Sequence, residues 1–404
     1  MERNLLIGQS GGPTAAINAS LAGVVDYALH YGKFTGVLGS INGIDGVLEE
    51  NFIGMEKFRA PERIRLLKQT PSSYLGSCRH KLPDEGEVYE QIFKVFEKHK
   101  ISAFIYIGGN DSMDTVEKLS RYGAENGKNV AVIGVPKTID NDLVLTDHTP
   151  GYGSAAKYIV NSIRQLALDT CVYDMKSVIV AEIMGRNAGW LTAAASLAND
   201  NHLSPVDIIC LPEVLFDTSD FLTHVEKTIE EKNSTIIAVS EGIRGRNGDY
   251  ILSGLAKSTA AADGFRHAAL GGVGRYIEHI ISENLGIKTR SIEFSTLQRC
   301  NSETASLCDI DESFLQGAEG ARLASEGETG VMVGILRKSG ADYEPYITSF
   351  DISLVANREK KIPEEMISKN GFFVTDEFIK YASPLISGQP KIIYNGGRIE
   401  FEVR

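Results

Sequence analysis

Short runs of residues that are apolar at almost every position recur along this sequence, and longer segments with helical spacing separate them. The runs lie at residues 5–7, 103–107, 130–135, 178–181, 208–211 and 236–239. A run without a polar face is typical of a parallel strand that is buried on both sides. In the segments between, residues such as Ile17, Leu21 and Val24, or Ala155, Ile159 and Ile163, form one apolar stripe. This repeated strand–helix–strand pattern predicts an α/β fold with mostly parallel sheets flanked by helices.

The length of the chain indicates more than one domain. At 404 residues it exceeds the typical domain of about 100 to 200 residues, so we expect two domains that share a cleft. We place the first at residues 1–142 and the second at 143–336, and we leave 337–404 as a C-terminal region without an assigned place. Residues 259–286 are predicted to form a long helix.

The charge of the chain limits its partners. With 53 acidic and 41 basic residues the formal net charge is -12, which argues against general attraction to nucleic acid or to an anionic membrane. Any phosphate-bearing ligand must therefore be held by a local cluster of Arg and Lys side chains.

The sequence also carries signs of cellular location. The five cysteines show no closely spaced pair, which is typical of reduced thiols. Met1 is followed within a few residues by the first apolar run, and no run approaches the roughly 18 apolar residues of a membrane span. We expect a cytoplasmic protein.

Polar turns that contain glycine or closely spaced charges follow three predicted strands, at residues 10–13, 108–112 and 136–142. In open α/β sheets, ligands bind at the carboxyl ends of the strands. Gly11 and Gly12 lead into a helix start, where free N–H groups and the helix dipole favour an anion. The alternative is a tight turn that needs glycine only for its geometry.

The second and third turns add charged side chains. Asp111 could be a ligand of magnesium, or its negative charge could select among anionic ligands by repelling some of them. The alternative is that Asp111 or Ser112 only caps a helix. Lys137 and Asp140 share the third turn. Phosphoryl transfer to a hydroxyl needs a carboxylate near the alcohol proton and cations near the moving phosphoryl. The alternative for this turn is an acid-rich loop that serves solubility.

Later strands also end in candidate ligand-binding residues. Arg186 closes one strand, Glu241 closes another, and Arg290 and Arg299 follow. Guanidinium groups bind phosphate oxygens in pairs, so these arginines are candidates for a sugar phosphate.

Taken together, these motifs resemble the phosphofructokinase family. The matching segments run in the family's order over roughly the first three quarters of the chain: Ser10-Gly11-Gly12, Leu75-Gly76-Ser77-Cys78-Arg79, Gly108-Gly109-Asn110-Asp111-Ser112, Thr138-Ile139-Asp140-Asn141-Asp142, Met184-Gly185-Arg186, Glu241, Arg290 and Arg299. The resemblance implies two Rossmann-like domains with the active site in the cleft between them. It also implies that residues 1–142, completed by later segments, bind the phosphoryl donor and that residues 143–336 bind the sugar phosphate.

The resemblance assigns roles position by position. Asp140 is expected to be the catalytic base, with Lys137 and Asp111 as the other catalytic residues. The donor is expected to contact Gly11, Gly12, Arg79 and Ser112. The substrate is expected to contact Thr138, Asp142, Met184, Gly185, Arg186, Glu241, Arg290 and Arg299. Mg²⁺ is the expected cofactor, with Asn110 and Asp111 as its ligands. Arg290 matches a position that reaches a neighbouring subunit's site, which implies a homodimer or homotetramer with shared active sites.

Two departures concern the donor. Members of the family that use ATP read GGDGS and PGTIDND, whereas this chain reads GGNDS and PKTIDND, so Asp111 and Lys137 both replace glycine. This pair resembles the pyrophosphate-dependent branch. At about 4 Å and an effective dielectric near 20, a carboxylate repels a nucleotide phosphate by roughly 4 kcal/mol, or about a thousandfold in affinity. Asn110 also stands where many relatives have Asp, and an amide is a weaker magnesium ligand than a carboxylate.

The resemblance therefore predicts reversible phosphoryl transfer from pyrophosphate to the 1-hydroxyl of fructose 6-phosphate. The closest alternative is an ATP-dependent phosphofructokinase. A dinucleotide-binding dehydrogenase is disfavoured because the first turn lacks G-x-G-x-x-G, and a non-catalytic protein because Asp140 and Thr138 are present. With an ordinary carboxyl pKa of about 3.9, Asp140 is expected to act more by positioning the hydroxyl than as a strong base.

Overall fold

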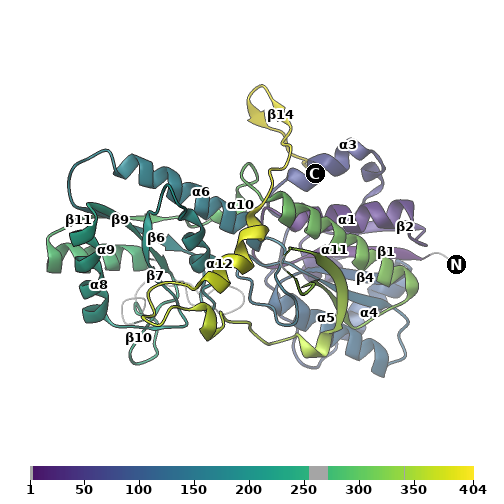
Figure 1. Cartoon of the computed structure of the whole chain (residues 1–404). Helices are drawn as coiled ribbons and strands as arrows, with labels where there is room; N and C mark the ends of the chain where they lie inside the picture. Colours follow the sequence, from purple (N-terminus) through teal and green to yellow (C-terminus); the bar gives the residue numbers. More distant parts are fainter. Residues whose placement is uncertain (1–2, 254–271, 341) are drawn as a thin grey trace.

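A computed structural model describes residues 3–253, 272–340 and 342–404. Its two main sheets lie side by side in Figure 1, and each has helices on both of its faces. This arrangement confirms the predicted α/β class. Every apolar run predicted as a strand forms one, because a run without a polar face can be buried on both sides.

The first sheet has seven strands in the order β13-β12-β5-β4-β1-β2-β3. They are β1 (Asn4–Gln9), β2 (Gly36–Ser40), β3 (Phe52–Gly54), β4 (Ile101–Gly108), β5 (Ala131–Pro136), β12 (Val331–Arg337) and β13 (Pro345–Asp351). The five inner strands are parallel, and only the edge strands β3 and β13 are antiparallel to their neighbours. The carboxyl ends of β1, β4 and β5 therefore lie next to one another at one edge.

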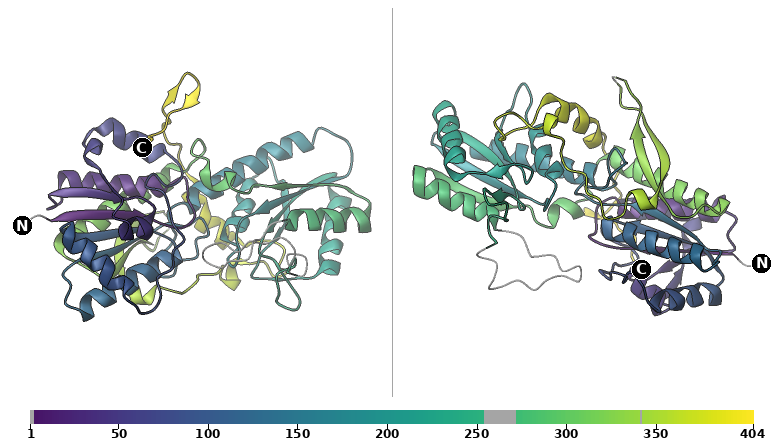
Figure 2. Two further views of the ribbon diagram at one scale, coloured as in Figure 1. Left: turned by 180° about the vertical axis from the view of Figure 1, so that it is seen from behind. Right: turned by 90° about the horizontal axis from the view of Figure 1, so that it is seen from below.

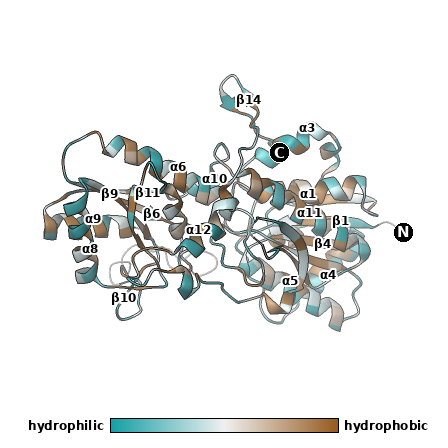
Figure 3. Cartoon of the chain, in the orientation of Figure 1, coloured by the Kyte–Doolittle hydropathy of each residue, from teal (hydrophilic) through white to brown (hydrophobic). Residues whose placement is uncertain are grey.

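Alternate residues of each inner strand enter different cores. In β4, Ile105 and Ile107 pack beneath α1 (Ile17–His30) and α11 (Leu307–Glu326), whereas Phe104 and Tyr106 pack beneath α4 (Val88–Lys98) and α5 (Asn110–Glu125). Figure 3 shows the result as hydrophobic strands between helices that carry both hydrophobic and hydrophilic residues. The smaller helices on this sheet are α2 (Gly43–Leu48) and α3 (Pro61–Gln69).

The second sheet has four parallel strands in the order β11-β6-β9-β7. They are β6 (Ser177–Ile183), β7 (Val206–Cys210), β9 (Ser234–Ser240) and β11 (Lys288–Glu293). One face packs on α6 (Tyr152–Thr170) and α12 (Asp376–Ala382), and the other on α8 (Thr218–Glu231) and α9 (Val273–Leu285). Of the helix predicted at 259–286, the described part is α9, and residues 259–271 lie outside the described residues. The short elements here are α7 (Trp190–Ala193), α10 (Leu297–Cys300), β8 (Leu215–Phe216) and β10 (Arg244–Gly245).

The C-terminal region joins the two sheets. It leaves β13 on the first sheet, and Phe378 of α12 then enters the core of the second. After the hairpin of β14 (Tyr394–Asn395) and β15 (Arg398–Ile399), buried Glu402 pairs with Lys57 at 2.8 Å and with Arg63 of α3 at 3.0 Å. Both views in Figure 2 show this yellow segment running between the two halves.

The chain order differs from the spatial order near the predicted domain boundaries. Helix α11 and strand β12 fall within the range 143–336, yet they pack on and join the seven-stranded sheet. How far each domain extends as a folding unit stays a prediction.

In the part of the chain that the structure describes, no helix combines the length and the apolar character needed to cross a membrane. The five cysteines are described and form no disulfide, as the sequence predicts.

Candidate active site

A cleft of about 610 Å³ lies where the carboxyl ends of β1, β4 and β5 face the turns after β6 and β9. Its lining includes every predicted site residue except Gly185 and Arg290. The predicted residues in the lining are Gly11, Gly12, Arg79, Asn110, Asp111, Ser112, Lys137, Thr138, Asp140, Asp142, Met184, Arg186, Glu241 and Arg299. Residues far apart in the sequence are thus brought to one place.

The two exceptions have different positions. Gly185 lies directly behind the cleft wall, where its N–H donates to Glu241 Oε1 at 3.4 Å and its carbonyl accepts a hydrogen bond from Ser240. Arg290 is exposed on the edge strand β11 and does not line the cleft of its own chain.

The backbone of the turn after β1 allows a cation to lie close to it. Thr14 Oγ1 accepts hydrogen bonds from the N–H groups of Ala16 at 3.2 Å and of Ile17, the first residue of α1, at 2.9 Å. Gly11 has a φ of 77°, a conformation that favours glycine. A Cβ atom there would lie 3.3 Å from Lys137 Nζ. Glycine therefore serves both the turn geometry and the close approach of a charge.

Lys137 is fully buried against this turn. Its Nζ donates to the carbonyl oxygens of Ser10 at 2.9 Å and Gly12 at 2.5 Å. Burial, together with the nearby positive charges of Arg299 and Arg79, lowers the pKa of Lys137 to about 7, although Asp140 opposes this shift. Burial and Arg79 also lower the pKa of Arg299. Three cations thus lie near one turn. An anion bound there would stabilise their positive charges.

In the turn after β4, Asn110 Nδ2 donates to the Arg358 carbonyl at 2.9 Å, but other polar side-chain atoms have no described partner. The cap of α5 is Gly109, without a side-chain hydrogen bond, so neither Asp111 nor Ser112 caps the helix. Asp111 lies 3.7 Å from Lys81 Nζ, and 30% of its side chain is exposed. The Oδ1 atom of Asn110 and the Oγ atom of Ser112 are buried and have no hydrogen-bond partner among the described residues.

The loop after β5 is tightly closed. Thr138 N donates to the Pro150 carbonyl at 3.1 Å, and Thr138 Oγ1 accepts from Asp140 N at 3.1 Å. Burial raises the pKa of Asp140, although Arg186 and Lys137 oppose that shift. Burial and repulsion by Asp140 raise the pKa of Asp142 to about 7. Asp140 is therefore a stronger base than its ordinary pKa suggested, because the cleft disfavours its charge.

The opposite wall comes from the second sheet. Met184, Arg186 and Glu241 follow β6 and β9. Burial raises the pKa of Glu241 to about 7, so this acid is partly neutral near pH 7. The attraction of Arg186 for Asp140 places its guanidinium near the loop of the first sheet, across the cleft.

Residues of the cleft lining that are not among the predicted site residues include four from two segments of the chain: Asn187, Ala188, Asn357 and Glu359. Asn357 and Glu359 belong to the C-terminal region, where no motif indicated a site. Asn187 Nδ2 donates to Glu359 Oε1 at 3.0 Å, so this segment reaches the turn after β6. Asn187 and Ala188 directly follow Arg186 in sequence, and that proximity was the available signal for them.

Comparisons with known proteins agree with this geometry. The family model described as phosphofructokinase matches residues 4–310. Two relatives named pyrophosphate–fructose 6-phosphate 1-phosphotransferase are similar over nearly the whole chain. The one from Methylococcus capsulatus is 39% identical and covers 98% of this chain and 94% of its own length. The one from Xanthomonas campestris is 40% identical and covers 97% and 93%.

A solved structure is also similar. The crystal structure described as a pyrophosphate-dependent phosphofructokinase from Nitrosospira multiformis is 35% identical to this chain, with a TM-score of 0.89 over 99% of this chain and 95% of that one. The match extends through the C-terminal region that the family model does not cover. With these similarities and a cleft built from the family's motifs, the chain belongs to the phosphofructokinase family.

Proposed function

We propose that this chain transfers a phosphoryl group from inorganic pyrophosphate to the 1-hydroxyl of D-fructose 6-phosphate. The products are fructose 1,6-bisphosphate and phosphate, and the reaction runs in both directions. The observation that carries the choice of donor is the placement of Lys137, buried at the phosphate-binding turn, together with Asp111 in the same cleft. Both residues replace the glycines typical of members that use ATP.

Pyrophosphate is a small, highly charged donor without a base or ribose to hold. Its binding energy must come from fixed charges, and Lys137, Arg79 and Arg299 converge near Gly11 and Gly12. A bound phosphate would favour the protonated form of Lys137, whose pKa burial lowers to about 7. The ammonium group then stands ready for the charge of the moving phosphoryl.

Enzymes of this family generally use a divalent metal ion. The described residues include no group of three or more His, Cys, Asp or Glu side chains suited to a metal. The cleft nevertheless fits Mg²⁺, which needs only one or two protein oxygens besides substrate phosphates, and Asn110 Oδ1 is buried there without a partner. Asn110 and Asp111 would hold the ion. Bound Mg²⁺ supplies charge neutralisation on the phosphate oxygens.

The sugar phosphate is assigned to the opposite wall, where Arg186 and Glu241 flank the space above Asp140. Asp140 orients the 1-hydroxyl and accepts its proton as the bond from O1 to phosphorus forms. The bond between that phosphorus and the bridging oxygen breaks, and phosphate leaves. The raised pKa of Asp140 favours this proton transfer.

A homodimer or homotetramer completes the proposal. Arg290 is exposed on an edge strand and lies outside its own cleft, which supports its assignment to a neighbouring subunit's site. Light scattering on the purified protein measures its molar mass in solution. A monomer at assay concentration would contradict this part of the proposal.

The donor is tested by assaying purified protein with fructose 6-phosphate and Mg²⁺, with either pyrophosphate or ATP as the donor. We expect kcat/KM for pyrophosphate to exceed that for ATP by at least tenfold. Turnover with ATP and none with pyrophosphate would establish the ATP-dependent alternative instead. Turnover with neither would contradict the assigned reaction.

A further inference from the structure

The catalytic loop is held from beneath by side chains of the C-terminal region. Asn141, which separates Asp140 from Asp142, is fully buried and adopts a left-handed conformation with φ of 54°. Its Nδ2 donates to the hydroxyl of Tyr381 at 2.7 Å. Its Oδ1 accepts from the N–H of Thr149 at 3.1 Å and from Lys360 Nζ at 3.4 Å. A non-glycine residue persists in this conformation when its surroundings hold it there.

Tyr381 and Lys360 bind two parts of the loop between β5 and α6. Residues 137–142, which leave β5, form its outgoing limb, and residues 146–151, which lead into α6, form its returning limb. The Tyr381 hydroxyl donates to the Asp147 carbonyl at 2.8 Å, and Lys360 Nζ donates to the same carbonyl at 2.7 Å. The main-chain N–H of Lys360 donates to the carbonyl of Asp142 at 2.7 Å. The two side chains therefore bridge Asn141 on the outgoing limb to Asp147 on the returning limb.

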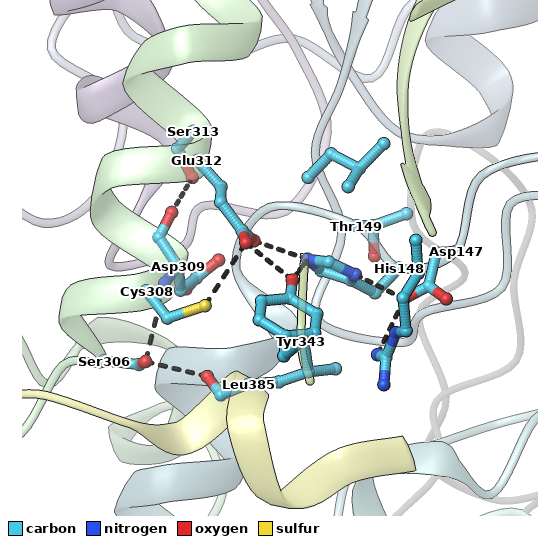
Figure 4. Close-up of polar contacts among 12 residues, drawn as sticks. Asp147, His148, Thr149, Ser306, Cys308, Asp309, Glu312, Ser313, Tyr343 and Leu385 are labelled. Carbon is cyan, nitrogen blue, oxygen red and sulfur yellow. Dashed lines mark hydrogen bonds and ion pairs between the residues drawn. The ribbon is translucent and has the colours of Figure 1, made fainter. Parts of the chain in front are cut away.

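The returning limb is itself fixed by the buried ion-pair network in Figure 4. Asp147 Oδ1 lies 2.8 Å from His148 Nδ1 and 3.0 Å from Arg337 Nη2. His148 Nε2 lies 2.6 Å from Glu312 of α11, which also accepts from the Tyr343 hydroxyl at 2.6 Å. Burial alone would lower the pKa of His148, but its hydrogen bonds to Asp147 and Glu312 raise it to about 9. Tyr381 and Lys360 thus attach Asn141 to a rigid support.

We propose that Tyr381 and Lys360 are positioning residues that set the geometry of Asp140 by holding the side chain of Asn141. This inference rests on the proposed role of Asp140 in phosphoryl transfer. Both residues lie beyond residue 310, where the family model ends. A small displacement of a catalytic group lowers the rate of the chemical step far more than it weakens substrate binding.

The first test is Tyr381→Phe, which removes the hydroxyl and keeps the ring against Trp190 and Phe378. We expect kcat to fall about tenfold, while KM for fructose 6-phosphate stays within about twofold. Tyr343→Phe is the matched control: it removes another partly buried tyrosine hydroxyl near Arg337, one that lies 3.5 Å from His148 but does not reach Asn141. Equal losses of kcat in both variants would reduce Tyr381 to a general structural role and overturn the inference.

A double-mutant cycle tests whether Tyr381 acts through Asn141. Asn141→Gly removes the amide yet tolerates the left-handed conformation. If the inference holds, adding Tyr381→Phe to Asn141→Gly lowers kcat no further, and independent effects that multiply would contradict it. Circular dichroism and the melting temperature verify that each variant is folded. All ratios are taken to wild type with whichever donor wild type uses, so a wrong donor assignment does not affect this result.

Discussion

The turn after β4 and the loop after β5 face the same cleft, yet they are held very differently. In the turn, Asn110 Oδ1 and Ser112 Oγ have no hydrogen-bond partner among the described residues, and Asp111 is partly exposed. In the loop, Lys137 and Asn141 are fully buried and bonded to main-chain or side-chain groups of distant segments. The turn leaves polar atoms of Asn110 and Ser112 without partners, whereas the loop pairs the polar atoms of Lys137 and Asn141 and leaves only Asp142 Oδ1 buried without a described partner.

This difference corresponds to two tasks. An anion with its metal ion must find free donors and acceptors when it arrives, so the turn after β4 gains its partners on binding. A base and an ammonium group that act in the transition state must already be in place, which the loop achieves at the cost of burying charge. Substitutions in the loop should therefore affect kcat, and substitutions in the turn should affect donor affinity and donor choice.

The largest effect is expected for Asp140→Asn. The amide keeps the shape of the carboxylate but cannot accept the hydroxyl proton, so kcat should fall by at least about a thousandfold, with little change in KM for fructose 6-phosphate. Steady-state assays in the pyrophosphate direction measure both constants. Retention of more than a tenth of wild-type kcat would show that another group accepts the proton.

The same variant should be more stable than wild type at neutral pH. Because the pKa of Asp140 is raised in the folded protein from 3.8, the folded state holds its proton more tightly, and folding stability falls as the pH rises above that value. Asp140→Asn removes this loss. We expect a higher melting temperature at pH 7.5 and no gain near pH 3.5, and an equal gain at both pH values would contradict burial of the charge as the cause.

The next largest effect is expected for Lys137→Gly, which should lower pyrophosphate-dependent kcat on the order of a hundredfold. The loss of the ammonium group removes a donor aimed at the phosphoryl group and leaves the Ser10 and Gly12 carbonyls without theirs. Lys137→Met is the matched variant, since it keeps the side-chain volume without the charge. Turnover near wild type in Lys137→Met would assign the role of Lys137 to packing.

The contrast between the two regions also explains what the sequence could predict. Apolar runs predicted β1, β4, β5, β6, β7 and β9, and the turns after these strands predicted most of the cleft, because parallel strands place their carboxyl ends at one edge. Asn357, Glu359 and Tyr381 reach the site through tertiary packing of a region that carries no local motif. The raised pKa of Asp140 was equally hidden, since burial by distant segments causes it.

A smaller effect on donor choice is expected for Asp111→Gly. The carboxylate of Asp111 should repel a nucleotide phosphate less than the roughly 4 kcal/mol expected above. Solvent reaches this carboxylate, and Lys81 Nζ lies 3.7 Å from it, so both screen its charge. A screened interaction of about 1.5 to 2 kcal/mol corresponds to a ten- to thirtyfold rise in kcat/KM for ATP relative to pyrophosphate. Asp111→Asn separates charge from size. An unchanged donor ratio in both variants would remove Asp111 from donor selection.

The smallest effect is expected for Ser112→Ala. Its hydroxyl has no hydrogen-bond partner among the described residues, so its removal should leave the melting temperature unchanged or slightly higher. Loss of one hydrogen bond to the donor, about 0.5 to 1.5 kcal/mol, should raise KM for pyrophosphate roughly two- to tenfold. Ser20→Ala is the matched control, because Ser20 Oγ is also buried without a described partner but lies within α1, outside the cleft. A rise in KM for Ser20→Ala, or a loss of stability for Ser112→Ala, would mean that the unused atoms of the turn are not reserved for the donor.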